Sequence, residues 1–199
     1  MKLVIYDFDG VLVDSVNAIV RYYDKFFEHV GLISPNWKDA AVLSKVRGMS
    51  FDQFVSAFVP EYCREQFCSY SPQFTFEEMA DATPLQPEAA VVIPDVSAKH
   101  TLAICTNRNT PVDDILDYHG IAKYFSLIIT SAEAEPKPSP DGLNKILHNF
   151  GEKRALYIGD SEVDYEAAQN AGIDFLGYKT DIEGINRISK HSEIYKYLW

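Results

Sequence analysis

The sequence predicts an α/β fold in which a parallel sheet, covered by helices on both faces, is interrupted by a small all-helical insertion. Two observations carry this prediction. Five short apolar runs are continuous rather than alternating, which is typical of parallel strands that are buried on both faces. The first run is followed by a long aromatic-rich segment, whereas the later runs alternate with helix-start signals.

The apolar runs are the expected strands of the sheet. They lie at Leu3–Phe8, Thr101–Thr106, Ser126–Thr130, Ala155–Gly159 and Asp174–Tyr178. Because none of them alternates polar and apolar residues, neither face of the sheet is expected to meet water.

Two segments between the later runs begin as helices do. Thr110 offers an N-cap, Pro111 a proline at the first helical position, and Asp113 an acid in the first turn. Ser139–Asp141 repeats this pattern, and Gly151 is the expected stop of the helix that follows. Strand and helix therefore alternate from about residue 90 to residue 178, which predicts an open α/β sheet.

Residues 15–84 break this alternation and are expected to form a separate helical domain. Residues 1–14 and 85–199 would then form the α/β core. Aromatic residues in the insertion recur at helical spacing, which predicts amphipathic helices around a small core of their own. The clearest examples are Tyr22, Tyr23, Phe26, Phe27, Phe51, Phe54 and Phe58.

Composition limits the possible partners and the compartment. The chain has 18 basic and 29 acidic residues and a formal net charge of -11, so neither nucleic acid nor a membrane is an expected partner. A phosphorylated substrate remains possible, because a metal ion can reverse the potential locally. Cys63, Cys68 and Cys105 are odd in number and form no CxxC pair, which favours reduced thiols. The N-terminus goes directly into the apolar run that begins at Lys2–Ile5, and Asp7 and Asp9 interrupt this run. Such a segment is typical of neither a signal peptide nor a membrane span, so we expect a cytoplasmic protein.

Polar residues gather where four of the expected strands end. Asp7–Gly10 ends the first strand, Thr106–Arg108 the second, and Gly159–Ser161 the fourth, with Asp164 close behind. The third strand leads to Glu135–Pro138, in which two prolines stiffen the backbone around one lysine. In an open parallel sheet, ligands bind beyond these carboxyl ends, near the point where strand order reverses. The sequence therefore predicts one site at this edge.

The residue types at this edge suit phosphoryl transfer. Asp7 can attack phosphorus to form an aspartyl-phosphate, while Asp9 can protonate the leaving alkoxide and later deprotonate water. Asp7 and Asp160 supply the oxygen ligands that Mg²⁺ prefers. Gly10 permits a sharp turn after the two acids.

Other residues would bind the phosphoryl group or the rest of the substrate. Thr106, the amide of Asn107, and Lys137 are suited to neutralise phosphoryl oxygens in the transition state. For Arg108, contact with substrate and a solvated position at the loop surface both remain open. The same two alternatives hold for Arg47, in a basic loop of the insertion.

Taken in order, these segments resemble the four motifs of the haloacid dehalogenase-like (HAD) superfamily. The matching residues are Asp7–Ser15, Thr106–Asn107, Lys137–Asp141 and Gly159–Asp164, and the resemblance covers nearly the whole chain. It implies a three-layer, Rossmann-like HAD core. The insertion at 15–84 resembles the helical cap domain of the phosphoglycolate phosphatase-like and β-phosphoglucomutase-like branch.

The resemblance also implies roles for individual residues. Asp7 would be the nucleophile and Asp9 the general acid/base. Mg²⁺ would be held by Asp7, by the backbone carbonyl of Asp9 and by Asp160, with Asp164 supporting the metal site.

The predicted function is a Mg²⁺-dependent phosphatase acting on a small phosphorylated metabolite, such as phosphoglycolate or a sugar phosphate. A phosphomutase of the β-phosphoglucomutase type is the nearest alternative, and a catalytically silent phosphate-binding protein on the same fold is the third. Asp9 disfavours a dehalogenase, which has no leaving alkoxide to protonate. A monomer and a homodimer are both compatible with the sequence.

Overall fold

The computed structural model describes residues 2–47, 51–108 and 112–198, and the chain divides into two units. Unit 1 combines Met1–Asp14 with Pro84–Trp199, and unit 2 is the intervening segment Ser15–Thr83. The chain thus leaves unit 1 after its first strand and returns to it for the rest of the sheet. Among the described residues, no helix has the length and apolar character that crossing a membrane requires.

Unit 1 contains the sheet and the helices that cover it. In chain order its elements are β1 (Leu3–Tyr6), α6 (Ala89–Ser97), β2 (Thr101–Cys105), α7 (Val112–Tyr118), the 3-10 helix η2 (Ala122–Tyr124), β3 (Leu127–Ile129), α8 (Asp141–Phe150), β4 (Ala155–Gly159), α9 (Glu162–Ala171), β5 (Asp174–Tyr178), β6 (Arg187–Ile188) and the 3-10 helix η3 (His191–Lys196).

The sheet is parallel throughout, with strand order β3-β2-β1-β4-β5-β6. Strand β1 is central: Leu3 is in register with Thr101 of β2 on one side and with Ala155 of β4 on the other. The predicted α/β parallel sheet is therefore confirmed. The two-residue strand β6 was not predicted, because Arg187–Ile188 is too short to give a periodic signal.

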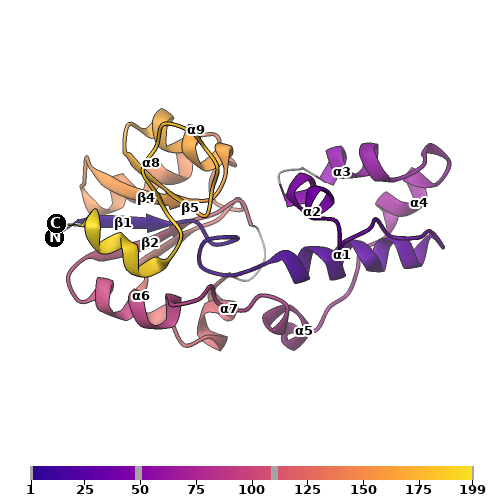
Figure 1. The fold of residues 1–199 in the computed structure, drawn as a ribbon, viewed down its shortest axis with the longest axis horizontal. Coiled ribbons are helices and arrows are strands. Elements are labelled where there is room, and N and C mark those ends of the chain that lie inside the picture. Colours follow the sequence, from indigo (N-terminus) through magenta and orange to yellow (C-terminus); the bar gives the residue numbers. More distant parts are fainter. Residues whose placement is uncertain (1, 48–50, 109–111, 199) are drawn as a thin grey trace. The chain divides into compact units, whose positions relative to one another are not determined.

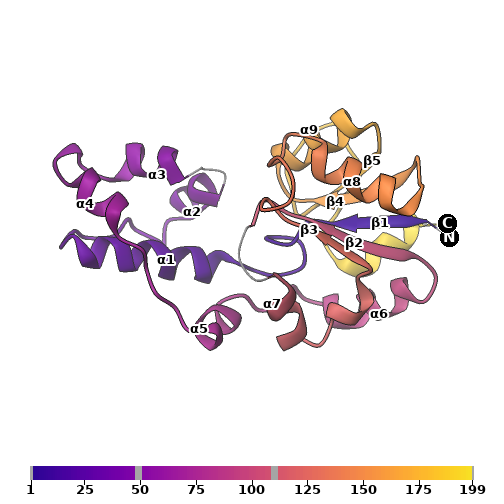
Figure 2. The ribbon, with the colours of Figure 1, turned by 180° about the vertical axis from the view of Figure 1, so that it is seen from behind.

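Helices cover both faces of the sheet (Figure 1, Figure 2). Helices α8 and α9 lie on one face, and α6 and η3 lie on the other. On the first face, Ile5 and Tyr157 pack with Ile146 of α8 and Ala167 of α9 in one buried cluster. This three-layer arrangement explains the continuous apolar runs, since alternate side chains of each strand enter two different cores.

The helix signal at Ser139–Asp141 differs from the structure by one residue. Helix α8 begins at Asp141, one residue after the expected start, and the Ser139 hydroxyl accepts the Asp141 amide at 3.3 Å. It ends at Phe150, and Gly151, which follows as the cap, has a φ of 65°, the left-handed conformation that suits glycine. Helix α7 begins at Val112, whereas the Thr110 and Pro111 signals lie outside the described residues.

Unit 2 is all-helical. Its elements are α1 (Val16–His29), α2 (Ala40–Arg47), α3 (Phe51–Phe58), the 3-10 helix η1 (Glu61–Cys63), α4 (Arg64–Ser69) and α5 (Phe76–Asp81). Aromatic residues fill its interior: Phe26 of α1 stacks on Phe67 of α4 with ring centroids 4.6 Å apart, and Phe54 of α3 is fully buried. The aromatic spacing therefore reflects a small hydrophobic core within this unit.

Candidate active site

Two aspartates follow adjacent strands at the point where strand order reverses. Asp7 comes directly after β1, and Asp160 directly after β4, the strand paired with β1 on its other side. The Asp7 amide donates to the carbonyl of Ile158 at 2.8 Å, which extends the β1–β4 ladder by one bond. The sheet itself therefore brings these two carboxylates together.

Lys137 lies among the acids as a buried cation. Its Nζ is 2.9 Å from Asp7 Oδ1 and 2.5 Å from Asp164 Oδ1, and it donates to the Tyr157 hydroxyl at 2.9 Å. The contacts with Asp164 and Tyr157 are hydrogen bonds, and the contact with Asp7 is an ion pair. The side chains of Lys137, Asp7 and Asp164 are 6%, 9% and 1% exposed, which makes this a desolvated charge cluster.

Asp164 is held in place from several directions. It is the third residue of α9, where it forms a capping box with Ser161. Its Oδ2 accepts the Ser161 hydroxyl at 2.6 Å and the Asp160 amide at 3.3 Å, while its Oδ1 accepts the Tyr157 hydroxyl at 2.8 Å. One carboxylate thus links the start of α9 to the buried lysine.

Gly159 makes room for that carboxylate. A Cβ at position 159 would lie 2.4 Å from the Asp164 Cβ, a separation that no real pair of side chains adopts. The last residue of β4 must therefore be glycine for α9 to bring Asp164 against the strand.

The three charges shift one another's pKa in different directions. Burial raises the pKa of Asp7 well above its usual range, and Asp164 and Asp160 raise it further, against the lowering effect of Lys137. For Asp164, burial acts upward, but the charge and hydrogen bond of Lys137 prevail and leave its pKa lowered. For Lys137, burial acts downward, but Asp164 and Asp7 prevail, so its pKa is raised and it stays an ammonium.

Asp9 has a different partner. Arg108 binds the Asp9 carboxylate bidentately: its Nε donates to Oδ2 at 3.0 Å and its Nη2 donates to Oδ1 at 2.7 Å. This pair is less buried than the lysine cluster, since the Arg108 and Asp9 side chains are 14% and 34% exposed. Of the two alternatives left open for Arg108, a purely solvated position is thereby excluded.

Thr106 and Asn107 follow β2 beside the same cluster. The buried Thr106 hydroxyl accepts the backbone amide of Arg108 at 3.1 Å, which orients the guanidinium's own loop. The Asn107 side chain bonds both backbone groups of Lys137, accepting its amide at 2.7 Å and donating to its carbonyl at 3.1 Å. Asn107 therefore anchors the lysine's backbone, a contact that the sequence did not predict. Arg47 ends α2, but its side chain lies outside the described part of the chain.

The acids at this edge could hold a divalent cation. Asp7, Asp160 and Asp164 each offer a carboxylate oxygen, and these oxygens lie within 4.8 Å of one another. Hard carboxylate oxygens are the ligands that Mg²⁺ and Ca²⁺ prefer. The raised pKa of Asp7 points the same way, because a cation beside it would offset the repulsion from the neighbouring acids. The donor set thus fits a hard divalent metal.

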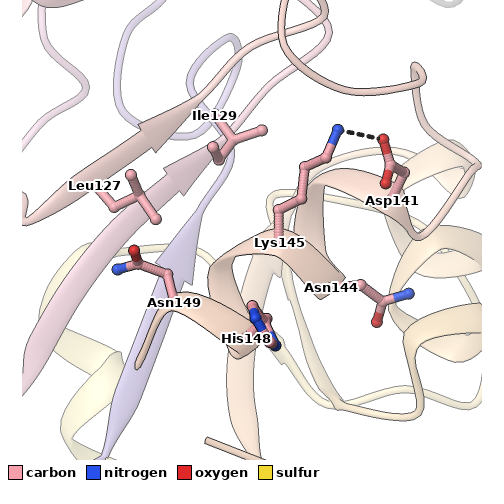
Figure 3. A pocket seen from close by; sticks show the side chains of 7 residues that line it. All are labelled: Leu127, Ile129, Asp141, Asn144, Lys145, His148 and Asn149. Carbon is pink, nitrogen blue, oxygen red and sulfur yellow. Dashed lines mark hydrogen bonds and ion pairs between the residues drawn. The ribbon is translucent and has the colours of Figure 1, made fainter. Parts of the chain in front are cut away.

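A surface hollow of about 430 Å³ lies elsewhere, between the edge strand β3 and helix α8 (Figure 3). Its lining consists of exposed or half-buried side chains: Leu127, Ile129, Asp141, Asn144, Lys145, His148 and Asn149. Its ion pair, Lys145–Asp141, is largely solvated, with side chains 45% and 38% exposed. We assign the chemistry to the buried cluster at the strand ends, because perturbed charges there are desolvated and convergent.

The model of the haloacid dehalogenase-like hydrolase family matches residues 4–178 of this chain. The chain belongs to this family. A phosphoglycolate phosphatase of Vibrio cholerae serotype O1 is 30% identical over 192 residues, which cover 89% of this chain and 84% of the relative. One from Aquifex aeolicus is 28% identical over 177 residues, covering 86% of this chain and 82% of the relative.

Solved structures of the haloacid dehalogenase-like family agree with the fold. A subfamily IA hydrolase from Geobacter sulfurreducens superposes with a TM-score of 0.85 at 28% identity, covering all of this chain and 97% of its own. A haloacid dehalogenase-like protein from Streptococcus pneumoniae gives 0.81 at 21% identity, covering 100% and 99%, and shows the fold alone. Family and relatives together identify the chain as an enzyme, a phosphatase of this hydrolase family.

Two residues of the site were missed by the sequence analysis. Tyr157 looks like an ordinary apolar residue of β4, yet its hydroxyl contacts Lys137, Asp164 and the carbonyl of Cys105. Ser161 lies within the fourth motif, and its spacing from Asp164 is that of a capping box. A signal for Tyr157 was available in the sequence, because it is the one aromatic residue of a strand that ends at the predicted site.

Proposed function

We propose that this phosphatase is Mg²⁺-dependent and hydrolyses a small phosphorylated metabolite through an aspartyl-phosphate on Asp7. The observation that carries the proposal is the buried cluster of Asp7, Lys137 and Asp164 beside Asp160, at the switch point of the sheet. Such a cluster concentrates charge where a dianionic phosphoryl group must be bound and attacked.

Asp7 is the proposed nucleophile. An Asp7 carboxylate oxygen bonds to phosphorus while the phosphorus–oxygen bond to the leaving group breaks, which yields aspartyl-phosphate and an alkoxide. The raised pKa of Asp7 opposes this step, since only the ionised carboxylate attacks. Lys137, 2.9 Å away, is the protein's own cation for holding that charge.

Mg²⁺ would be held by Asp7 and Asp160 together with the backbone carbonyl of Asp9, with Asp164 in support. When bound, it supplies positive charge that favours the ionised nucleophile and neutralises phosphoryl oxygens. The oxygens of Asp7, Asp160 and Asp164 within 4.8 Å of one another support this assignment. Thr106, Asn107 and Lys137 remain the proposed phosphoryl-binding residues.

Asp9 is the proposed general acid/base. It gives its proton to the departing alkoxide, and in the second step it takes a proton from water as that water attacks the aspartyl-phosphate. The second step releases inorganic phosphate and restores the Asp7 carboxylate. Arg108 supports this role as a positioning residue, because bidentate contact fixes the plane of the Asp9 carboxylate.

Phosphoglycolate is the first substrate to test, because the curated relatives bear that substrate in their names at 28–30% identity. A sugar phosphate is the second. A screen of phosphorylated metabolites, read as released phosphate, ranks the two by kcat/KM.

The proposal is tested on p-nitrophenyl phosphate. We expect hydrolysis with Mg²⁺, loss of activity with EDTA, and recovery when Mg²⁺ is restored; activity indifferent to chelation contradicts the metal assignment. Asp7→Asn should abolish turnover and the acid-labile phosphoenzyme. Near-normal activity in Asp7→Asn contradicts the covalent mechanism, whereas Asp160→Asn should raise the Mg²⁺ concentration required.

A further inference from the structure

Gln86 is a buried polar side chain outside the four motifs, and both ends of its amide are bound. Its Nε2 donates to the carbonyl of Gly10 at 3.2 Å, and its Oε1 accepts Lys179 Nζ at 2.8 Å. Gln86 is 7% exposed. An amide with a carbonyl at one end and an ammonium at the other has one possible orientation, because reversing it would set donor against donor and acceptor against acceptor.

The hydrogen bond from Gln86 to the Gly10 carbonyl connects Gln86 to the loop that carries Asp9. Gly10 follows Asp9 and has a φ of 81°, so the chain turns there in a conformation that suits glycine. Its amide donates to the Val13 carbonyl at 2.9 Å, and the amides of Leu12 and Val13 return to the Phe8 carbonyl. A tether on the Gly10 carbonyl therefore fixes the turn that sets the direction of Asp9.

Gln86 is itself held against this loop. Its backbone amide donates to the Leu12 carbonyl at 2.9 Å, and Val13 pairs with Leu85 in an antiparallel bridge. The amide of Asp14 donates to the Pro84 carbonyl at 2.8 Å. The segment by which the chain re-enters unit 1 is thus hydrogen-bonded along the loop by which it leaves.

Lys179 completes the tether from a strained position. It follows β5 with a φ of 49°, a left-handed conformation that a lysine seldom adopts, and its amide donates to the Ile188 carbonyl at 2.9 Å. Such an outlier persists where surrounding structure fixes it, and it points to a role for the side chain. From this position the Lys179 ammonium donates to Gln86 Oε1 at 2.8 Å.

We propose that Gln86, held by Lys179, is a positioning residue that fixes the Asp9 loop through the Gly10 carbonyl. This inference rests on the proposed function of Asp9 as the general acid. It implies that loss of Gln86 slows the reactions that need a proton on the leaving group, and spares those that do not. A role in folding alone would lower both alike.

The test compares kcat/KM for two substrates in Gln86→Leu and Lys179→Met. For p-nitrophenyl phosphate, whose leaving group departs without a proton, we expect a change within about twofold. For phosphoglycolate, or glycerol 2-phosphate if it is turned over faster, we expect a loss of about tenfold or more, since small misplacements of a catalytic group are costly. Gln169→Leu and Lys123→Met, at exposed positions of unit 1, are the matched controls.

Gln86→Glu separates the two halves of the tether. A carboxylate keeps the pair with Lys179 but has no proton to donate to the Gly10 carbonyl, so we expect the fold to be retained and the leaving-group effect to remain. Wild-type kcat/KM for the alkyl phosphate in Gln86→Glu contradicts the inference. An equal loss on both substrates in Gln86→Leu also overturns it.

A second measurement does not depend on catalysis. Amide hydrogen exchange at Gly10, Leu12 and Val13 should quicken several-fold in Gln86→Leu while α8 keeps its protection; unchanged exchange in this loop overturns the tether. Asp9→Asn tests the proposed acid role of Asp9 separately from the tether. If that variant shows no leaving-group dependence, the proposed acid role of Asp9 fails, and the exchange data still decide whether Gln86 holds the loop.

Discussion

Asp7 and Asp9 leave the same strand two residues apart, yet they lie in contrasting surroundings. The Asp7 side chain is 9% exposed, with Lys137 and two further aspartates beside it, and its pKa is raised. The Asp9 side chain is 34% exposed and is bound by a guanidinium on a loop. Residue type is the same at both positions, so the difference between the two environments is what supports the separate roles proposed for Asp7 and Asp9.

The two acids also differ in what holds them. Asp7 is fixed by its backbone bond to β4 and by its ion pair with the buried Lys137. Asp9 sits on a turn that depends on hydrogen bonds from Gln86 and His191 to the carbonyls of Gly10 and Val11. Variants on the two sides should therefore differ in the free energy of unfolding, most for Lys137 and least for Arg108.

Replacing Lys137 by methionine should destabilise the buried charge cluster around Asp7. It leaves Asp7 and Asp164 as buried carboxylates without their cation, so we expect a loss of about 3–5 kcal/mol in the free energy of unfolding and a loss of roughly 10³-fold in kcat/KM. Urea denaturation and steady-state kinetics measure the two effects. Lys145→Met is the control, since its exposed pair with Asp141 contributes less than about 1 kcal/mol. Equal stability of the two variants contradicts a buried charge cluster.

Acidification should lower the free energy of unfolding through His191, whose ring donates to the Val11 carbonyl in the turn after Asp9. Burial lowers the pKa of His191 to about 4, against the opposing effect of its hydrogen bond to Val11. The unfolded chain takes up this proton at about pH 6.5 and the native protein only near pH 4, so stability falls as pH drops through that window, by about 3 kcal/mol at most.

His191→Gln isolates this effect, since it removes the titrating ring and keeps a donor near the Val11 carbonyl. Between pH 6.5 and 4, its unfolding free energy should fall less steeply than that of the wild type. His148→Gln, on an exposed position of α8, controls for loss of an imidazole. Parallel curves for wild type and His191→Gln would show that another group carries the dependence.

Tyr157→Phe tests the hydrogen bonds of the Tyr157 hydroxyl with Lys137 and Asp164. It removes one acceptor from Lys137 and one donor from Asp164 without changing their charges, so we expect a loss of about 1–2 kcal/mol in unfolding free energy and of a few-fold in kcat. Thermal unfolding and steady-state kinetics measure the two losses. Tyr62→Phe is the control, because Tyr62 is 83% exposed. A neutral result means that the phenol only fills space.

Arg108→Met should have the smallest effect on stability. The Asp9–Arg108 pair is partly exposed, so we expect less than about 1 kcal/mol in unfolding free energy. Activity should fall about tenfold for alkyl phosphates, because Asp9 loses the group that orients it. Arg154→Met, at an exposed position, is the control for charge. A variant that binds substrate poorly at unchanged kcat indicates instead that Arg108 contacts the substrate.

Much of the fold could be predicted from local patterns. The runs at Ala155–Gly159 and Asp174–Tyr178 coincide with β4 and β5, and the glycine signal at Gly151 coincides with the end of α8. These signals work because continuous apolar runs and left-handed caps are local consequences of burial and backbone geometry. Strand β6 has no such local signal, since its two residues pair with β5 through tertiary contacts.

The partners of the candidate site were less predictable. Strand ends indicated that Asp7, Lys137 and Asp160 gather at one edge, because parallel strands all end on the same side of a sheet. The Asp9–Arg108 pair joins residues 99 apart in sequence, and Lys179 reaches Gln86 across 93 residues. Contacts of this kind depend on how a loop turns and on which rotamer its packing allows, and periodicity reports neither.

The parallel sheet, the helical insertion and the acids at the strand ends can be predicted from the sequence alone, since they follow from periodicity and from the cost of burying charge. Only the tertiary structure decided that Lys137 is shared by Asp7 and Asp164, that Arg108 belongs to Asp9, and that Gln86 reaches the Gly10 carbonyl. The physical reason is that electrostatic and hydrogen-bond partners are chosen by distances of a few ångströms, which the fold sets and the spacing of residues along the chain does not.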